Sequence, residues 1–428
     1  MHTREFDNLH QDTLYEKSEV VLRAGLLALS SGMGAYRVKR VMSRIANALG
    51  ISNQAHVTLT EINSTCSNHH TYCTKVATLQ NVGVNSDRIS KIGQLTLNLR
   101  RKTIKHSIKC ITDELISIEE APLLYSTTST GIFAGIACFS FAFLLGGNFA
   151  EMVLAFLGAF FGQIVRRLML VRHMNQFVTT VVAVFVALFA YSIASLIGLE
   201  FGLIEVRDIS GYIASLLFVI PGFPLATGGL DIAKLDFSSG IQRVCYALVI
   251  ICCATATGSS FAQVLGMSPI PTTFSLHGFS NEQDIIKLAL VLLFSFIGVL
   301  GFALIFNSTH KVALTSALIG AFANTFRIVL ATLGITAFIS TTIAAMFVGI
   351  LAAVLVKWFD FTRITLSVPA IVIMVPGSYL FYGSYEALTG NLMLSWQNEA
   401  QAFLRLLALP VGLSIARFLT DKKWRVDK

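Results

Sequence analysis

Long apolar runs follow one another from Thr128 onward, with only short polar breaks between them. A helix needs about 20 mostly apolar residues to cross a membrane. Ten runs are candidates, the second of them short: 129–147, 149–165, 177–199, 209–228, 241–266, 285–306, 312–333, 336–356, 363–382 and 399–419. With 54% hydrophobic and 13% charged residues, the chain is too apolar for an ordinary soluble protein. The sequence therefore predicts an α-helical polytopic membrane protein with ten transmembrane helices.

The region before these runs, residues 1–125, is mixed and mostly polar, which predicts a separate N-terminal domain. Residues 56–62 and 71–79 alternate polar and apolar side chains, which is typical of the strands of a hairpin. Apolar residues at helical spacing predict two helices within 18–50 and single helices at 86–105 and near 111–120. We therefore expect a small α+β domain.

Basic residues gather on one side of the predicted spans. When alternate connections are pooled, one side holds Arg166, Arg167, Arg172, Lys234, Lys311, Lys357, Arg363 and the basic tail 421–428. The other side holds Arg207 almost alone among many acids. Because Lys and Arg favour the cytoplasmic face, both termini of this multi-pass chain are predicted to be cytoplasmic. The N-terminus is polar and carries acids, so we expect no signal peptide there.

The N-terminal domain adds basic residues of its own. Arg37, Arg40 and Arg44 form a stripe opposite the apolar face of a predicted helix, which we interpret as a solvated or membrane-facing surface. The net charge of the whole chain is +8. This charge fits an anionic inner leaflet better than nucleic acid, so membrane lipids and not nucleic acid are the expected partners.

The stretch "CSNHHTYC" places Cys66, His69, His70 and Cys73 close together. A structural zinc site draws four ligands with defined spacing, usually from two separate turns. One such turn is a weak signal, so we predict ordinary hairpin residues, no metal and no cofactor. The chain also has no nucleophile elbow, paired metal-ligand helix or phosphate loop, and we predict that it is not an enzyme.

The membrane region is predicted to contain two copies of a five-span unit. The segment "LGAFFGQIVRR" (157–167) resembles "IGAFANTFR" (319–327), and "FVIPGFPL" (218–225) resembles "IMVPGSYL" (373–380). Both pairs keep the same order at similar offsets, 162 and 155 residues. An odd number of spans forces the copies into opposite orientations, which is the inverted-repeat layout of many secondary transporters. We therefore predict domains at 1–125, 126–268 and 284–420, followed by the tail 421–428.

The stretch "SLLFVIPGFPLATGGLD" (215–231) places helix breakers and an acid inside a predicted span. Pro221 lies 12 residues after Ile209, and Pro376 lies 12 residues after Ile364 from the opposite face. Each break is thus about 18 Å into a core about 30 Å thick. Backbone freed by proline is tolerated there only inside protein or beside a cavity. We therefore expect a binding site rather than two packing kinks, built from Pro221, Gly222, Pro224, Pro376 and Gly377.

Three motifs carry a resemblance to a known family: "SGMGAYRV" (31–38), "PGFPLATGGLD" (221–231) and "PAIVIMVPG" (369–377). In a ten-span chain with a cytoplasmic N-terminal region, they resemble the threonine/serine exporter (ThrE) family in its fused form. The resemblance covers residues from about 15 to 420. It implies efflux across the bacterial inner membrane, driven by the proton-motive force. Some relatives are split in two near the fifth span, and one such pair is associated with export of dicarboxylates such as succinate.

Asp231 is the predicted proton carrier. It lies about seven residues past Pro224, near the cytoplasmic end of the fourth span. An acid inside a span is costly unless it is paired or exposed to water, and is therefore a functional candidate. The simpler interpretation is a loop acid beside Lys234.

Arg327, deep in the seventh span, is the predicted substrate residue. Its guanidinium could bind a substrate carboxylate with two hydrogen bonds. It could instead extend outward or pair with Glu386. Asn324, one turn earlier, would share its face. Gln163 in the second span is a further candidate for the transport path.

The favoured function is proton-driven export of small hydroxy amino acids, threonine and serine. Export of C4-dicarboxylates is the close alternative, and a second cation at the midplane would favour it, because two carboxylates need two partners. A membrane-anchored hydrolase or sensor is an alternative of another class, although ten spans with matched breaks are more than an anchor needs. The sequence is compatible with a homo-oligomer but leaves the oligomeric state open.

Overall fold

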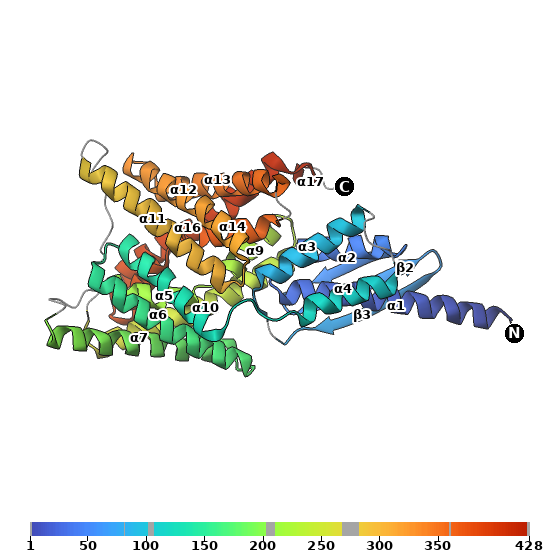
Figure 1. Ribbon diagram of the computed structural model, residues 1–428, viewed down its shortest axis with the longest axis horizontal. Helices are drawn as coiled ribbons and strands as arrows, with labels where there is room; N and C mark the ends of the chain where they lie inside the picture. Colours follow the sequence, from blue (N-terminus) through green and yellow to red (C-terminus); the bar gives the residue numbers. More distant parts are fainter. Residues whose placement is uncertain are drawn as a thin grey trace. The chain divides into compact units, whose positions relative to one another are not determined.

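The computed structural model describes residues 2–80, 82–101, 107–202, 210–267, 282–358 and 361–425. The chain is mostly helical (Figure 1). It divides into two compact units. The first comprises Met1–Leu123, Thr227–Val244 and Phe359–Thr362, and the second comprises Leu124–Ala226, Cys245–Trp358 and Arg363–Lys428. The predicted N-terminal region thus shares its unit with segments that are distant in sequence. Arg207, on the predicted outer side, lies outside the described residues.

In the N-terminal part of the first unit, the described residues form four helices and three strands. They are α1 (His2–Ser30), α2 (Ala35–Ala48), β1 (Ser52–Val57), β2 (Glu61–Asn68), β3 (Thr71–Thr78), α3 (Ser86–Arg100) and α4 (Ile108–Glu120). Helices α1 and α2 contact the sheet and each other, while α3 and α4 contact the helices. Helix α2 buries Val38, Val41, Met42 and Ile45, which is the apolar face that its sequence spacing predicts.

The sheet has three antiparallel strands in the order β1-β2-β3, one more than the predicted hairpin. The expected strand 56–62 is wrong because it contains a turn between Val57 and Glu61. The backbone N–H of Glu61 donates to Thr58 Oγ1 at 3.0 Å, so a threonine side chain closes the turn. No glycine or proline marks this turn in the sequence.

The second unit is built from helices that run through most of the remaining chain. They are α5 (Thr127–Leu144), α6 (Phe149–Val171), α7 (Gln176–Glu200), α8 (Ser210–Leu216), η1 (Leu217–Val219), α9 (Gly222–Ile232), α10 (Phe237–Val264), α11 (Glu282–Ile305), α12 (His310–Thr332), α13 (Ala337–Trp358), α14 (Arg363–Val372), α15 (Gly377–Leu388), α16 (Leu392–Thr420) and α17 (Lys422–Arg425). The end of α9 and the start of α10 belong to the first unit.

Within the described residues, eight helices are long and apolar enough to cross a membrane. Two bent pairs add up to two more spans: α8 and η1 with α9, bent by 60°, and α14 with α15, bent by 49°.

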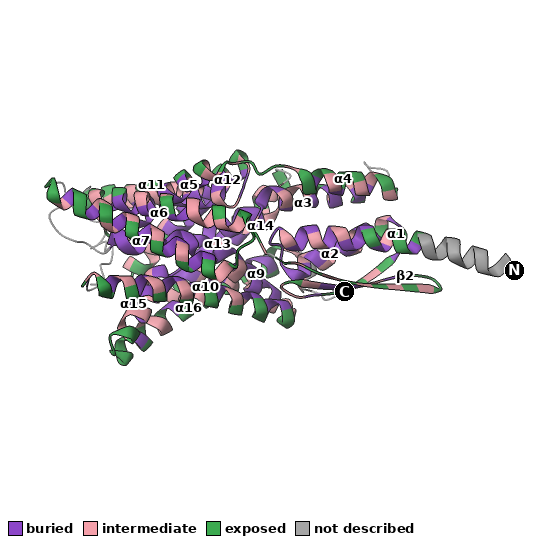
Figure 2. Cartoon of the chain, turned by 90° about the horizontal axis from the view of Figure 1, so that it is seen from below, coloured by how far each residue is buried: buried purple, intermediate pink, exposed green. Residues whose placement is uncertain are grey.

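Helix α6 extends beyond the short predicted run because Arg166 and Arg167 continue it and donate to backbone carbonyls. Exposed residues recur along α6 and α7 (Figure 2), among them Phe161, Phe185 and Phe189, as expected of helices in lipid.

Small residues let the long helices approach closely, which is common where lipid surrounds the helices. Helices α13 and α16 form one of these contacts. A Cβ atom on Gly412 of α16 would lie 2.3 Å from the carbonyl oxygen of Thr342 and 2.7 Å from Cβ of Ala345. The crossing therefore requires glycine for space.

Gly412→Ala is expected to destabilise the protein by about 1–3 kcal/mol, the usual cost of overpacking, because the obstructing backbone oxygen cannot rotate away. Gly298→Ala is the matched control. Its new methyl would lie 3.1 Å from Cδ1 of Ile373, the end of a flexible side chain. Thermal unfolding of both variants in one detergent measures the difference, and equal melting temperatures would contradict the packing argument.

Candidate functional site

Both predicted breaks are present, and the two broken helix pairs contact each other within the second unit. Pro221 stands between η1 and α9, and Pro376 stands between α14 and α15. A Cβ atom on Gly377 would lie 2.6 Å from side-chain atoms of both Leu217 and Ile220. On the other side, a Cβ atom on Gly222 would lie 2.7 Å from Val372. The glycines beside the prolines therefore allow the two breaks to pack together.

Arg166 of α6 supports the first break. In a continuous helix the carbonyl of Phe218 would accept from the N–H of residue 222, but the N–H of Gly222 donates to the carbonyl of Ile220 at 2.9 Å. Arg166 Nη1 donates to the Phe218 oxygen instead, at 3.4 Å. This residue therefore does more than mark the predicted cytoplasmic side of the chain.

A cavity of about 410 Å³ lies beside the second break. Its lining consists of Phe141, Leu144, Leu145, Leu217, Asn324, Arg327, Ile328, Ala331, Thr332, Ile373, Met374, Val375, Pro376, Gly377, Ser378, Tyr379 and Arg405. Four of the predicted site residues, Asn324, Arg327, Pro376 and Gly377, thus share one cavity. Its volume is within the range of small-molecule sites, about 300–1,000 Å³.

Arg327 is held at the cavity by a short chain of hydrogen bonds. Its Nε donates to Asn324 Oδ1 at 3.0 Å, and Asn324 Nδ2 donates to Ser295 Oγ at 2.8 Å. Asn324 and Ser295 are both buried. These two hydrogen bonds therefore fix the position of the Arg327 guanidinium. No ion pair joins Arg327 to Glu386 in the part of the chain that the structure describes. The interpretation as a structural pair is therefore not supported by the geometry.

Arg405 of α16 is a second cation in the same cavity. Its Nη2 donates to the hydroxyl of Tyr379 at 3.1 Å, and its guanidinium lies 3.8 Å from the centre of the Tyr379 ring. Its Nη1 is buried and has no hydrogen-bond partner among the described residues. Arg405 is also close enough to Arg327 for the two positive charges to repel. A ligand that accepts hydrogen bonds from both guanidiniums would relieve this repulsion.

The cavity lining is positively charged without compensation. None of its residues is Asp or Glu, and no carboxylate in the described ranges pairs with either Arg327 or Arg405. The first turn of α15, including Ser378 and Tyr379, also contributes to the wall. The first amide groups of a helix have no intrahelical acceptor and carry partial positive charge. The arrangement can therefore bind a small anion.

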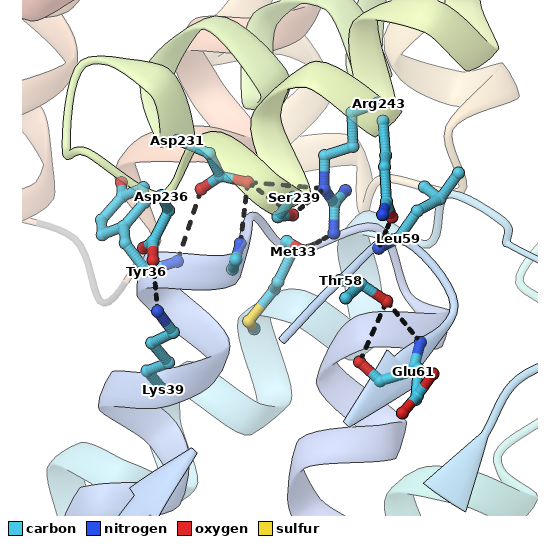
Figure 3. Close-up of polar contacts among 12 residues, drawn as sticks. Met33, Tyr36, Lys39, Thr58, Leu59, Glu61, Asp231, Asp236, Ser239 and Arg243 are labelled. Atoms are coloured by element: carbon cyan, nitrogen blue, oxygen red, sulfur yellow. Dashed lines mark hydrogen bonds and ion pairs between the residues drawn. The ribbon is translucent and has the colours of Figure 1, made fainter. Parts of the chain in front are cut away.

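Asp231 does not line this cavity; it lies in the first unit with both carboxylate oxygens occupied (Figure 3). It is fully buried at the end of α9. The backbone N–H groups of Ala35 and Tyr36 donate to it at 2.9 and 3.4 Å. Ser239 Oγ donates at 3.3 Å, and Arg243 Nε lies 3.4 Å from Oδ2. The alternative of a simple loop acid beside Lys234 does not describe this environment.

The other predicted site residues lie around the first break. Pro221 lines a second, smaller cavity together with Gly377, and Gly222 contacts Val372 as described above. Pro224 lies in the first turn of α9. Gln163 is buried in α6, and its Oε1 has no hydrogen-bond partner within the described ranges. Pro221, Gly222, Pro224 and Gln163 do not line the cavity that contains the arginines.

The cysteine and histidine cluster of the hairpin is spread over two environments. Cys66 is buried and lies opposite Cys73 in the ladder between β2 and β3, whereas His69 and His70 are exposed at the turn. Asn53 Nδ2 donates to the Cys66 sulfur at 3.3 Å. Among the described residues, no group of three or more His, Cys, Asp or Glu side chains is arranged to hold a metal ion.

The basic stripe on α2 is half-buried and partly stacked. The guanidiniums of Arg37 and Arg40 both lie 5.8 Å from the ring centre of Tyr36. Arg44 Nη1 donates to Thr96 Oγ1 at 3.3 Å. Burial lowers the pKa of Arg44, and the neighbouring charges of Arg40, Arg100 and Arg37 lower it further. The stripe is thus a concentrated positive surface on the first unit.

Sequence reasoning missed three residues of these sites, Arg405, Tyr379 and Arg243. Arg405 and Arg243 each lie inside an apolar run, and a charge inside a predicted span is a functional signal in itself. That signal was present for both arginines. Tyr379 had no comparable signal, because its role depends on its contact with Arg405.

Comparison with protein families gives two matches that together span most of the chain. A model of the ThrE family, described as a threonine/serine exporter, matches residues 19–265. A second model, described as "Threonine/Serine exporter, ThrE", matches residues 291–419, which include Arg327 and Arg405.

Comparison with curated proteins gives one relative, and comparison with solved structures gives none. The chain is 22% identical over 227 residues to the "Probable succinate transporter subunit YjjP" of Escherichia coli (strain K12). The alignment covers 53% of this chain and 86% of that relative. No solved structure matches the chain.

Proposed function

The chain belongs to the threonine/serine exporter family, and from this premise we propose that it exports small carboxylates, with C4-dicarboxylates preferred, across the bacterial inner membrane. Hydroxy amino acids are the second candidate class. The substrate site in this proposal is the cavity beside the second break, and the substrate residues are Arg327 and Arg405.

The observation that carries the proposal is a pair of guanidiniums facing one cavity without a carboxylate in its lining. A dicarboxylate supplies one acceptor for each guanidinium and cancels both charges. An amino acid supplies one carboxylate and adds an ammonium group, which needs acceptors of its own. The lining offers it few, because Asn324 Oδ1 already accepts from Arg327 and the Tyr379 hydroxyl accepts from Arg405.

Hydroxy amino acids remain a candidate because of the family description and because the lining has hydroxyl groups. Ser378, Tyr379 and Thr332 could all contact a substrate hydroxyl. The carbonyl of Ile373 could accept from an ammonium group, because the N–H of Gly377, its partner in a continuous helix, donates to Val375 instead. These groups are weaker partners for a buried positive charge than a carboxylate would be.

The inverted repeat is part of this proposal, and the matched breaks support it. Two five-span units of opposite orientation would bring their broken helices together from opposite faces. The contacts of Gly377 with Leu217 and Ile220, and of Gly222 with Val372, fit that arrangement. With both termini in the cytoplasm, the ends of α5 and α12 that line the cavity would face outward, so the structure would represent an outward-open state.

Coupling to proton entry is a further proposal, supported by the family resemblance. Asp231 remains the candidate proton carrier, with a condition that its contacts impose. Its oxygens are already occupied by two amides, a hydroxyl and Arg243. Proton uptake would therefore require some of these contacts to break, so it would be linked to a local rearrangement of α9.

Competition in proteoliposomes tests the substrate class. The full chain is reconstituted with radiolabelled succinate on one side and an imposed pH gradient. We expect succinate transport that excess malate or fumarate abolishes and that excess threonine or serine reduces far less. Threonine transport that no dicarboxylate inhibits would instead favour the hydroxy amino acids. Empty liposomes and the Arg327→Gln variant control for leakage.

A further inference from the structure

One buried polar network joins the α1–α2 turn to the end of the first broken span (Figure 3). We call it the latch and define it as Met33, Gly34, the amides of Ala35 and Tyr36, Asp231, Ser239 and Arg243. Asp231 and Ala35 are 196 residues apart in the sequence. All latch residues belong to the first compact unit.

Asp231 provides the N-terminal cap of α2. The first amides of a helix lack intrahelical acceptors, and a side chain at the N-cap position usually supplies one. The N-cap residue of α2 is Gly34, which has no side chain for this role. The Asp231 carboxylate takes its place by accepting from the amides of Ala35 and Tyr36. Helix α2 therefore begins correctly only when the end of α9 lies against it.

Gly34 is required for space rather than for an unusual backbone angle. Its φ of −65° and ψ of 153° are available to any residue. A Cβ atom on Gly34, however, would lie 2.7 Å from Asp231 Oδ1. Any larger residue at position 34 must therefore displace the carboxylate. This requirement connects two of the sequence motifs, because "SGMGAYRV" contains Gly34 and "PGFPLATGGLD" ends at Asp231.

Arg243 of α10 contacts both sides of the latch. Its Nη2 donates to the carbonyl of Met33 at 2.8 Å, and its Nε donates to Ser239 Oγ at 3.1 Å and lies 3.4 Å from Asp231 Oδ2. The side chains of Arg243 and Asp231 are 1% and 0% exposed. A buried ion pair often adds little net stability. What it does here is fix the relative positions of the α1–α2 turn, α9 and α10.

Helix α9 connects the latch to the break. It starts at Gly222, directly after Pro221, and ends at Ile232, one residue past Asp231. Its 11 residues span only about 16 Å. A short helix that is held at its last turn cannot tilt or slide without moving what holds it.

We infer that Asp231 and Arg243 are positioning residues for transport, and that α9 and the α1–α2 turn move as one body when the broken spans rearrange. The N-terminal region then takes part in the transport motion and is not a separate sensor attached to the membrane helices. The inference goes beyond the proposed function, and it rests on that function only for the transport measurement. If Asp231 acted solely as a proton carrier, a change at Gly34 that shifts the carboxylate but keeps it as a titratable acid would not stop transport.

Gly34→Ser and Arg243→Gln test the inference in the full-length protein. A serine at position 34 can cap α2 with its own hydroxyl, while its Cβ displaces Asp231, so α2 keeps a cap and loses the latch. Lys39→Gln is the matched control. Lys39 and Asp236 join the same two segments through an ion pair whose side chains are 34% and 17% exposed, and such partly exposed pairs contribute little.

Three measurements are made on each variant: the maximal rate of succinate transport in proteoliposomes, the affinity for succinate in detergent, and hydrogen exchange of the peptide 227–243. For Gly34→Ser and Arg243→Gln we expect the maximal rate to fall at least tenfold and exchange in 227–243 to accelerate. Succinate affinity should change less than twofold, because the cavity residues are untouched. Lys39→Gln should match the wild type in all three.

Two results would overturn the inference. The first is faster exchange in 227–243 with an unchanged transport rate, since the latch would then be broken without consequence. The second is loss of transport with unchanged exchange, which would mean that these residues act in another way. If the wild-type protein neither binds nor transports succinate, the proposed substrate fails. Hydrogen exchange then decides alone, because unchanged exchange in Gly34→Ser would show that the latch does not hold α9.

Discussion

Arg405→Gln is expected to lower the kcat/KM for succinate transport by about thirty-fold or more. Removing one partner of a buried, hydrogen-bonded charge pair costs about 2–5 kcal/mol, and each 1.4 kcal/mol is a factor of ten. In the proposed complex the guanidinium of Arg405, which lines the cavity and forms no ion pair within the described ranges, would bind one succinate carboxylate. Initial rates of labelled succinate transport in proteoliposomes, measured across concentrations, give the change.

The comparison with a monocarboxylate makes this test specific. Arg327, held by Asn324, would still bind a single carboxylate in the Arg405→Gln variant, so inhibition of transport by lactate should change much less than inhibition by malate. Tyr379→Phe should have an intermediate effect, because it keeps the ring beside Arg405 and removes the hydroxyl that accepts from it. Succinate transport at the wild-type rate in Arg405→Gln would exclude Arg405 from the substrate site.

The breaks were predictable from the sequence because their causes are local. Proline cannot donate a backbone hydrogen bond and glycine gives a helix little support, so the Pro-Gly pairs at Pro221 and Pro376 indicate breaks. Pro369 and Pro410, which no glycine follows, lie inside continuous helices. Arg327 and Asn324 were predictable as neighbours for a similar reason, since residues three apart share a helix face. In the structure Arg327 Nε donates to Asn324 Oδ1 at 3.0 Å, which agrees with that spacing.

The latch and the second arginine depend on contacts that local sequence does not encode. Asp231 was predicted as a candidate, but its partners Ala35 and Arg243 come from a distant turn and from the following helix. Arg405 lies in a different span from Arg327, and the packing of α16 against α13 and α15 brings it to the same cavity. The Thr58 turn was missed because a threonine hydroxyl, rather than glycine or proline, closes it.

Gly377→Val is expected to abolish transport while leaving the protein folded. Position 377 starts α15 directly after the second break, and a Cβ atom there would lie 2.6 Å from Cδ2 of Leu217 and from Cδ1 of Ile220. A branched side chain would push the two broken spans apart at the point where transport requires them to rearrange. The overpacking itself costs about 1–3 kcal/mol, which should lower the melting temperature without preventing folding. Gly258→Ala is the control, since its nearest atoms, on Leu216 and Phe381, are 3.1 Å away.

A second substitution separates a steric block from a general loss of structure. Leu217→Ala removes one of the two side chains that the valine would meet, so the double variant Gly377→Val with Leu217→Ala should regain part of the succinate transport lost in Gly377→Val. Gly377→Ala should lie between the wild type and Gly377→Val, because the atoms it meets are the ends of flexible side chains. Transport by Gly377→Val at the wild-type rate would mean that the contact between the breaks is not part of the moving machinery. A double variant that stays inactive although its melting temperature returns to normal would place the effect on the cavity, which Leu217 also lines, rather than on the contact between the two broken spans.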